Sequence, residues 1–299
     1  MTLPNFLVIG AAKSGTTSLH RYLSQHPEIY VVPGKLGCFF AFEGQTPAHK
    51  GPADWKMDRL AVTDLAAYEA HFDGVDGEKA IGEVCAAYIY HPTAAERIRC
   101  HLPDVKLVAI LRDPVDRAYS NYMHKVRDGE EPLKSFADAI DAEPRRIRED
   151  WRYNWHYLSR SKYFDQLRRF YGLFAKEQIQ VHLFDDLCSR PHKLFRDLFG
   201  FLDVNEDFQP DTSIRYQVTG VPHSRAFANF IRQPSIVKTA YRSVMPARYR
   251  QRLTKSLEAL NLRKPSLPDP IRQELLAVFR DDVLRLQDLI GRDLSRWLR

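Results

Sequence analysis

The sequence contains few cysteines, the residues that stabilise small domains through disulfides or zinc sites. Its 299 residues include four cysteines, with no CxxC pair and no His–Cys spacing typical of a zinc site; they are scattered at Cys38, Cys85, Cys100 and Cys188. Free thiols in a reducing compartment are the simplest interpretation, and we therefore expect a cytoplasmic protein. A chain of this length buries a core large enough to fold without disulfides or a structural metal ion.

Long apolar runs are also missing. No segment approaches the ~18 apolar residues that a membrane-spanning helix needs. A strand-like segment begins already at Phe6, so we expect no signal peptide before it. The net charge of +6 is a mild excess, which favours an anionic ligand. It does not distinguish a nucleotide from a nucleic acid, an acidic glycan or a membrane surface.

Short apolar segments alternate with helical patterns along most of the chain. The segments that we interpret as strands are Phe6–Ile9, Ile29–Val32, Ala80–Val84, Lys106–Leu111 and Ile179–Phe184. This alternation predicts an α/β fold of the P-loop-like, three-layer kind, in which helices flank a central parallel sheet. We find no internal repeat and no clear linker. One domain is expected over residues 1–299, with a core over about 5–225 and a helical segment over about 226–299.

Some segments between and after these strands are interpreted from composition and periodicity. Residues 33–60 are rich in Gly and Pro and are expected to form a loop. Residues 136–151 are highly charged and are expected to form one helix, with further helices near 246–260 and 270–290.

The first strand runs into a turn that has the setting of a phosphate-binding P-loop. The pattern GxxxxGK(S/T) is incomplete, because Thr16 follows the second glycine and the lysine is at position 13. Backbone N–H groups can still converge on an anion there, and the positive end of the following helix favours negative charge. We predict an anion site, in preference to a plain capped turn, made of Lys13, Ser14, Gly15, Thr16, Thr17 and Ser18.

A second strand-to-helix junction begins with Arg112. Its guanidinium offers a bidentate fork to a phosphate, and Ser120 adds a hydroxyl two turns along the helix. Both junctions should lie on one rim of the sheet, because ligands of parallel sheets bind beyond the carboxyl ends of the strands. Two alternatives involve Asp113: it caps the helix and pairs with Arg112, or it holds magnesium in an enzyme that also needs the missing P-loop lysine.

Together these residues resemble a known family. Lys13 to Thr17 is similar to the 5'-phosphosulfate loop of sulfotransferases that use 3'-phosphoadenosine 5'-phosphosulfate (PAPS), and Arg112 with Ser120 is similar to their 3'-phosphate motif. The similarity covers most of residues 5–225 and is greatest to bacterial enzymes and to the heparan-sulfate N- and O-sulfotransferase branch. It continues through His26-Pro27, Phe39-Phe40, Gly82-Glu83, Pro103 to Lys106, Arg117 to Ser120, Tyr163 with Leu167, and Phe184 to Leu187.

The resemblance implies in-line transfer of a sulfuryl group from PAPS to a hydroxyl or amine of a small-molecule, glycan or lipid acceptor, with release of 3',5'-adenosine bisphosphate (PAP). It also implies donor contacts from Tyr163, Gly220, Ser224 and Arg225. A sulfuryl group carries less negative charge than a γ-phosphoryl group, so backbone amides and one lysine suffice and we expect no metal. No nucleic-acid partner is expected.

Several residues are candidates for the chemistry. Lys13 would stabilise the charge on the bridging oxygen as the nucleotide leaves. His124 is the first candidate for the general base, because an unperturbed histidine titrates near pH ~6.5 and a histidine follows the same Arg-Ala-Tyr-Ser segment in the N-sulfotransferase branch. Glu83 matches an acidic residue near the donor in relatives, with a buried ion-pair partner as the alternative. Lys35 either neutralises the sulfuryl group or lies on the surface.

One residue that relatives use is missing. Many of them have Lys-Glu before the Phe-Phe pair, and that glutamate acts as the base. Here the pair is Lys35-Leu36, and Glu43 follows seven residues later. The identity of the base therefore stays open between His124, Glu83 and Glu43.

Two further segments have a notable composition. Residues 150–163 interleave aromatic and cationic side chains, which are typical of an acceptor pocket but more often of a core with solvated charges. Residues 232–264 hold nine Lys or Arg against one acid, Glu258. This segment contacts a membrane or an acidic acceptor, or it forms a solvated face, and we favour the solvated face.

Competing functions are a P-loop kinase of a small metabolite and a non-catalytic anion- or membrane-binding module. The acceptor and the oligomeric state are not fixed by these patterns.

Overall fold

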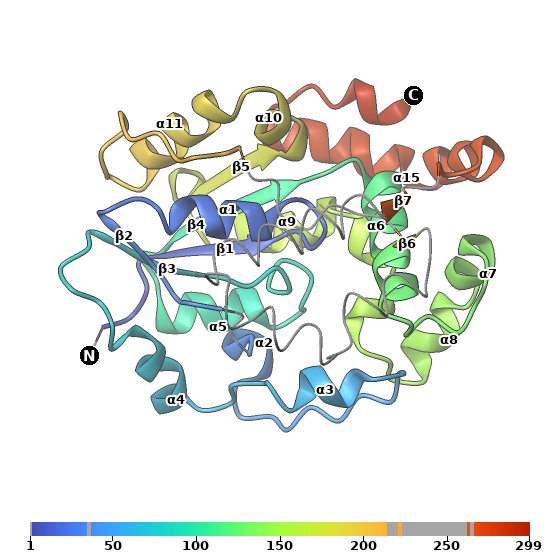
Figure 1. The fold of residues 1–299 in the computed structure, drawn as a ribbon, viewed down its shortest axis with the longest axis horizontal. Helices are drawn as coiled ribbons and strands as arrows, with labels where there is room; N and C mark the ends of the chain where they lie inside the picture. The colour runs from blue at the N-terminus through green and yellow to red at the C-terminus, as the bar shows by residue number, and fades with distance from the viewer. Residues whose placement is uncertain (1, 35–36, 214–220, 223–261, 264–265) are drawn as a thin grey trace, which may run out of the picture.

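The computed structural model describes residues 2–34, 37–213, 221–222, 262–263 and 266–299. Its centre is a five-stranded sheet in the order β2-β3-β1-β4-β5, and all of its neighbouring strands are parallel (Figure 1). The strands are β1 (Phe6–Gly10), β2 (Ile29–Val31), β3 (Ala80–Val84), β4 (Lys106–Leu111) and β5 (Ile179–Leu183). Each predicted strand is confirmed to within one residue at either end.

The helices flank this sheet. Among the described residues they are α1 (Thr16–Leu23), α2 (Phe39–Phe42), α3 (Asp54–Asp58), α4 (Leu65–Glu69), α5 (Ala94–His101), α6 (Pro114–Arg127), α7 (Phe136–Asp141), α8 (Glu143–Arg148), α9 (Phe164–Tyr171), α10 (Phe184–Ser189), α11 (Pro191–Phe201) and α15 (Asp269–Ile290). Short 3-10 turns are η1 (Ala70–Phe72), η2 (Tyr153–Trp155), η3 (Ser159–Ser161), η4 (Lys176–Gln178) and η5 (Ser295–Leu298). A separate antiparallel pair joins β6 (Val221–Pro222) to β7 (Leu262–Arg263).

The strands are apolar on both faces because each face is covered. In β1, Phe6 and Val8 pack into one core with α1 and α11, whereas Leu7 and Ile9 pack into the other with α2, α5 and α6. Figure 1 shows α11 on one side of the sheet and α2 and α5 on the other. All five residues of β1 are buried, which is typical of a parallel sheet between two helical layers. The predicted three-layer α/β fold is confirmed.

The structure corrects two predictions about secondary structure. Residues 33–60 are not all loop, because they contain α2 and α3. The single helix expected over 136–151 is two helices, α7 and α8, and α8 begins with a proline in its first turn. Proline has no N–H to donate to the preceding turn, so it starts a new helix more readily than it continues one. The helix expected near 246–260 lies outside the described residues.

The two strand-to-helix junctions lie together at the carboxyl edge of the sheet. The strands β1 and β4 are direct neighbours, and α1 and α6 start shortly after them. The main chain is also joined there, since the Ala11 N–H donates to the Ile110 carbonyl at 2.7 Å. The expectation that both motifs share one rim is confirmed. None of the helices that the structure describes is long and apolar enough to cross a bilayer.

Candidate active site

A cavity of about 560 Å³ opens beside these junctions. One end, which we call the loop end, is lined by Lys13, Thr16 and Thr17. The opposite part, which we call the far end, is lined by side chains from α3, from α6 and from residues 153–160. The residues of the far end that matter below are Lys56, Asn121, His124, Lys125, Asp128, Glu130, Asn154 and Arg160. Residues 84–87, the last residue of β3 and the three that follow it, also line the cavity, and we call them the cavity wall.

The turn at the loop end requires a glycine. Gly15 has a φ of 93°, in the left-handed region. A Cβ atom added there would come within 3.0 Å of side-chain carbons of Leu187 and Phe184. Gly15 caps α1 without any side-chain hydrogen bond, and the first turn of α1 has no acidic residue. The N–H groups of that turn have no partner within the helix, so the turn presents donors and the positive end of the helix dipole.

The predicted loop residues do not all face the cavity. Lys13, Thr16 and Thr17 line it, whereas Ser14 is fully buried and its N–H already donates to the Ala11 carbonyl at 3.2 Å. Ser18 is also buried, one turn into α1. The structure therefore offers the hydroxyls of the two threonines and the Lys13 ammonium to a ligand, while Ser14 and Ser18 support the turn from behind.

Arg112 lies directly against this loop. Its Nη1 atom donates to the carbonyl of Lys13 at 3.3 Å, although the two residues are 99 positions apart in the sequence. The guanidinium is mostly buried over the ring of Phe184, at 4.9 Å, and its Nη2 atom is 3.7 Å from Asp116. Ser120 is buried further along α6. The two predicted anion-binding motifs thus meet in space.

Asp113 is the N-cap of α6. Its carboxylate accepts a hydrogen bond from the Asp116 N–H at 2.9 Å, as the capping alternative predicted, but Arg112 lies at ion-pair distance from Asp116 and not from Asp113. Burial raises the pKa of Asp113 to about 6. In the part of the chain that the structure describes, no three His, Cys, Asp or Glu side chains come together as ligands for a metal ion.

Tyr163 supports the Arg112 junction from inside the core. It is fully buried, and its hydroxyl donates to the Arg112 carbonyl at 3.0 Å. The Tyr163 N–H donates in turn to the Asp282 carboxylate of α15 at 2.8 Å. These contacts give Tyr163 a role in holding the end of β4, and the direct nucleotide contact expected for it stays a prediction.

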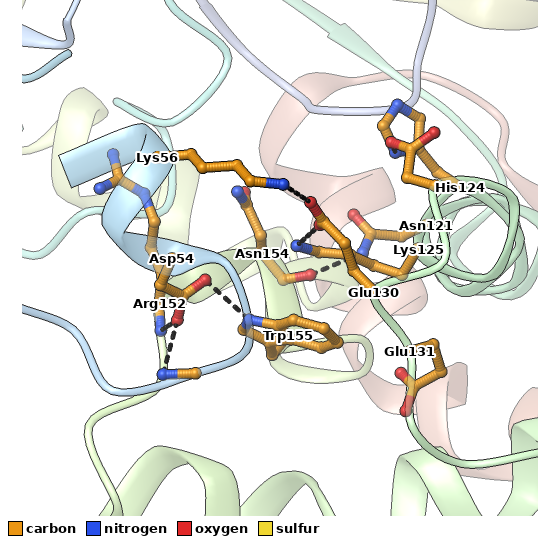
Figure 2. Close-up of polar contacts among 12 residues, drawn as sticks. Asp54, Lys56, Asn121, His124, Lys125, Glu130, Glu131, Arg152, Asn154 and Trp155 are labelled. Atoms are coloured by element: carbon orange, nitrogen blue, oxygen red, sulfur yellow. Dashed lines mark hydrogen bonds and ion pairs between the residues drawn. The ribbon is translucent and has the colours of Figure 1, made fainter. Parts of the chain in front are cut away.

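His124 lines the cavity one turn after Ser120 on the same helix (Figure 2). Its Nδ1 atom is 3.1 Å from the Asp128 carboxylate, and both side chains are about one third exposed. An aspartate in this place orients an imidazole ring and holds one of its nitrogens as the donor. The sequence analysis missed Asp128, and the signal for it was the i,i+4 spacing from His124.

Glu83 lies behind the cavity wall. It is fully buried on β3 and does not line the cavity, although its neighbours Val84 and Cys85 do. Burial raises the pKa of Glu83 to about 8, against a smaller opposing effect of the nearby Tyr88 hydroxyl. At neutral pH this side chain is therefore mostly a neutral acid. The structure gives no support to a direct contact with the acceptor, and the catalytic role expected for Glu83 stays a prediction.

Glu43, the substitute for the missing glutamate, is occupied elsewhere. Its carboxylate lies 2.6 Å from Nε2 of His101 and 3.9 Å from Nε of Arg97, both on α5, and Glu43 is not a lining residue. Other predicted site residues lie outside the described part of the chain: Lys35, Leu36, Gly220, Ser224, Arg225 and nearly all of 232–264.

Charged pairs cross the far end of the cavity. Figure 2 shows Lys56 of α3 directed toward Glu130, which follows α6, at 3.7 Å. Glu130 also binds Lys125 at 2.9 Å, and the Lys125 ammonium lies 4.0 Å from the centre of the Trp155 ring. Trp155 in turn donates from Nε1 to Asp54 of α3 at 2.8 Å. These contacts tie α3 to α6 and η2 on opposite sides of the cavity.

The aromatic and cationic stretch 150–163 is divided between the core and the cavity. Trp155 and Tyr157 are fully buried, as the core interpretation expected, but Arg152 and Arg160 are buried too and are not the solvated charges that it predicted. Asn154 and Arg160 line the cavity instead, and the Asn154 carbonyl accepts from the Asn121 amide of α6 at 2.8 Å. The four cysteines are all free thiols, as expected.

The fold agrees with the comparison to known proteins. Residues 4–209 match the model of the sulfotransferase family. The chain belongs to the sulfotransferase family. Transfer of a sulfuryl group from PAPS is the general property of that family.

Particular relatives share this family. The chain is similar to the crystal structure of a sulfotransferase from Alicyclobacillus acidocaldarius, with 36% identity, a TM-score of 0.79 and coverage of 100% of both chains. It is 25% identical to the membrane-associated sulfotransferase kil1 of Dictyostelium discoideum, over 78% of this chain and 64% of that protein. It is 28% identical to the human bifunctional heparan sulfate N-deacetylase/N-sulfotransferase 3, over 99% of this chain and 31% of that protein. The chain therefore spans less than two thirds of the length of these two curated relatives.

Proposed function

We propose that this protein transfers a sulfuryl group from PAPS to a hydroxyl or amine of a small-molecule, glycan or lipid acceptor, and releases PAP. The observation that carries the proposal is the contact between Arg112 and the Lys13 carbonyl. It joins two cationic junctions on one rim, and the donor has two anionic groups, the 5'-phosphosulfate and the 3'-phosphate. One nucleotide can therefore engage both junctions.

The donor is held by the loop end and by the Arg112 junction. The turn at Gly15, with Lys13, Thr16 and Thr17, binds the 5'-phosphosulfate through N–H groups, hydroxyls and one ammonium group. Arg112 and Ser120 bind the 3'-phosphate. The resemblance adds Gly220, Ser224 and Arg225 to this second group, and Ser14, Ser18 and Tyr163 act by supporting the two junctions.

The reaction is an in-line displacement at sulfur. The acceptor oxygen or nitrogen forms a bond to sulfur as the bond from sulfur to the bridging oxygen of the donor breaks. The Lys13 ammonium stabilises the negative charge that collects on that oxygen. His124 takes the acceptor proton, and the Asp128 carboxylate holds the ring by its Nδ1 nitrogen. Lys35 is proposed to neutralise the sulfuryl group.

Calorimetry with PAP tests this proposal. Wild-type protein should bind PAP, and Lys13→Ala and Arg112→Ala should each weaken binding by about tenfold or more, since each removes a charged hydrogen-bond donor. Lys193→Ala is a matched control, because Lys193 is exposed on α11 and pairs with Asp197. No binding of PAP, or binding by both variants that equals that of the wild type, would overturn the proposal.

The two competing functions predict different binding results for the same variants. A P-loop kinase would bind ATP in a magnesium-dependent way and would tolerate the loss of Arg112. A module that binds membranes through 232–264 would bind anionic liposomes equally well after Lys13→Ala. Turnover is measured as PAP release together with the mass gain of one sulfuryl group over a panel of phenol, sugar and amine acceptors.

A further inference from the structure

Arg160 occupies an unusual position at the far end of the cavity. It belongs to η3 and lines the cavity, yet its side chain is only 4% exposed. A guanidinium is strongly hydrated in water and keeps its charge at all physiological pH values. Its burial therefore needs compensation from the groups around it.

The contacts of Arg160 fix its geometry without neutralising it. Nη1 donates to the Asn154 side-chain oxygen at 3.3 Å, and Nη2 donates to the Ala86 carbonyl at 3.2 Å. The guanidinium carbon lies 5.0 Å from the centre of the Tyr153 ring and 5.8 Å from that of Tyr90. Both hydrogen-bond acceptors are neutral, so the planar fork is held in place with its positive charge unpaired.

The other cations of the far end are already paired. Lys125 and Lys56 share the Glu130 carboxylate, and the buried Arg152 behind them pairs with Asp58. Within the ranges that the structure describes, no carboxylate lies within ion-pair distance of Arg160. Arg160 is thus a buried charge that lines the cavity and has no carboxylate partner among the described residues.

The electrostatic surroundings of Arg160 agree with a charge that is only partly compensated. Burial lowers the pKa of Arg160 below its usual range, against smaller opposing effects of Tyr153, Tyr90, Cys38 and Cys85. A second buried guanidinium, Arg117 of α6, lies nearby: burial lowers the pKa of Arg117 to about 10, and the charge of Arg160 adds a smaller effect in the same direction. Arg117 also leaves its Nη1 atom without a hydrogen-bond partner. Two adjacent buried cations make this part of the molecule favourable for an anion.

We propose that Arg160 binds an anionic group, a carboxylate or a sulfate ester, that the acceptor carries, and that the enzyme thereby selects acidic acceptors. This inference rests on the proposed function, which assigns the anionic groups of the donor to the loop end and to Arg112. The described contacts of Arg160 are with Asn154, Ala86 and two tyrosine rings, and they include no residue of the loop end. We therefore assign the anion that pairs with Arg160 to the second substrate.

Binding of matched probes to the protein saturated with PAP tests the inference. The sugar probes are glucose, glucuronate and glucose 6-sulfate, and the aromatic probes are phenol, 4-hydroxybenzoate and phenol-4-sulfonate. In at least one series an anionic probe should bind about tenfold or more tightly than its neutral counterpart, which is the size expected for a charged hydrogen-bonded pair. Comparison of the carboxylate probe with the sulfur-containing probe shows which anion the site prefers. Equal affinities within both series overturn the inference.

Variants of Arg160 show whether this residue causes the preference. Arg160→Gln should abolish the preference and leave the affinity for PAP unchanged, and Arg160→Lys should keep part of it because the charge stays while the fork is lost. Arg168→Gln is the matched control, since Arg168 is an exposed arginine on α9 that pairs with Asp165. If Arg160→Gln does not fold, the Arg160→Lys variant decides: an undiminished preference overturns the inference.

The two proposals can fail separately. If PAP does not bind, the proposed function fails, and the same probes added to the protein without PAP still test Arg160. If PAP binds and an acceptor of the panel is sulfated, but no anionic probe is preferred, the role of Arg160 is overturned and the proposed function stands.

Discussion

The loop end of the cavity is made mainly of main-chain groups from one short turn, whereas the far end is made of side chains from four separate elements. Lys13, Gly15 and the first turn of α1 lie next to one another in the sequence, directly after β1. Lys56, Glu130 and Arg160 come from α3, from the segment after α6 and from η3. In the function that we propose, the turn binds the phosphosulfate of the donor, and the groups that tertiary packing brings together contact the acceptor.

The largest expected effect belongs to neither end but to Glu83, which is buried next to the cavity wall. The buried Glu83 binds its proton with a pKa of about 8 in the folded protein and about 4.3 when unfolded. The folded state therefore holds more protons than the unfolded state between these values, and stability decreases as the pH rises through them. We expect a loss on the order of 4 kcal/mol from about pH 5 to about pH 8.

Urea denaturation of wild type and Glu83→Gln over this pH range measures the effect. The glutamine variant has no proton to lose at this position and should show a clearly flatter profile. Parallel profiles for the two proteins would mean that Glu83 is ionised in the folded state and is a candidate base after all.

The next prediction concerns His124 at the far end, whose loss should lower turnover without changing the binding of the donor nucleotide. His124→Ala should lower turnover about 100-fold, the lower range for loss of a general base, and should leave the PAP affinity within about twofold of wild type. Turnover is measured with an acceptor of the panel that the wild-type protein sulfates, and the PAP affinity is measured by calorimetry.

The exposed His192 on α11 provides a matched control through His192→Ala, which should change neither quantity. Asp128→Asn removes the partner of the His124 ring and should move the pH–rate profile of the enzyme. If turnover of His124→Ala equals that of wild type, the base is another residue and the pairing with Asp128 is structural.

The smallest effect is expected for the ion pair that crosses the far end. Lys56 is 56% exposed and lies 3.7 Å from Glu130, so the pair contributes less than about 1 kcal/mol to stability. Lys56→Ala should change the melting temperature little and should leave PAP binding unchanged, while the KM for the acceptor changes. A large drop in the melting temperature would show that the two sides of the cavity depend on this pair to stay together.

The strands and the loop end were predictable from sequence because their signals are local. A continuous apolar run such as Phe6–Ile9 has few alternatives to a buried parallel strand, and the turn at Gly15 follows directly. The short helices α2 and α3 were missed because four or five residues are too few to show a helical period. The break between α7 and α8 had a signal in the proline at position 144, which the charge pattern obscured.

The far end was predictable only in part. The sequence analysis selected His124 and noted the aromatic and cationic stretch 150–163, but it did not single out Asp128 or Arg160. Asp128 is one of many acidic residues at helical spacing from a histidine, so its pairing is visible only when the side chains are placed. The unpaired charge of Arg160 is visible only when every neighbouring carboxylate is assigned to its own partner.

The sequence by itself determined the sheet, the turn at Gly15 and the two basic junctions, because hydrophobic runs and backbone conformation depend on neighbouring residues. The tertiary structure alone decided that Lys13 and Arg112 touch, that Glu83 is buried behind the wall, and that Arg160 lies in the cavity without an acidic partner among the described residues. The physical reason is that charge compensation and desolvation depend on distances between residues far apart in the chain.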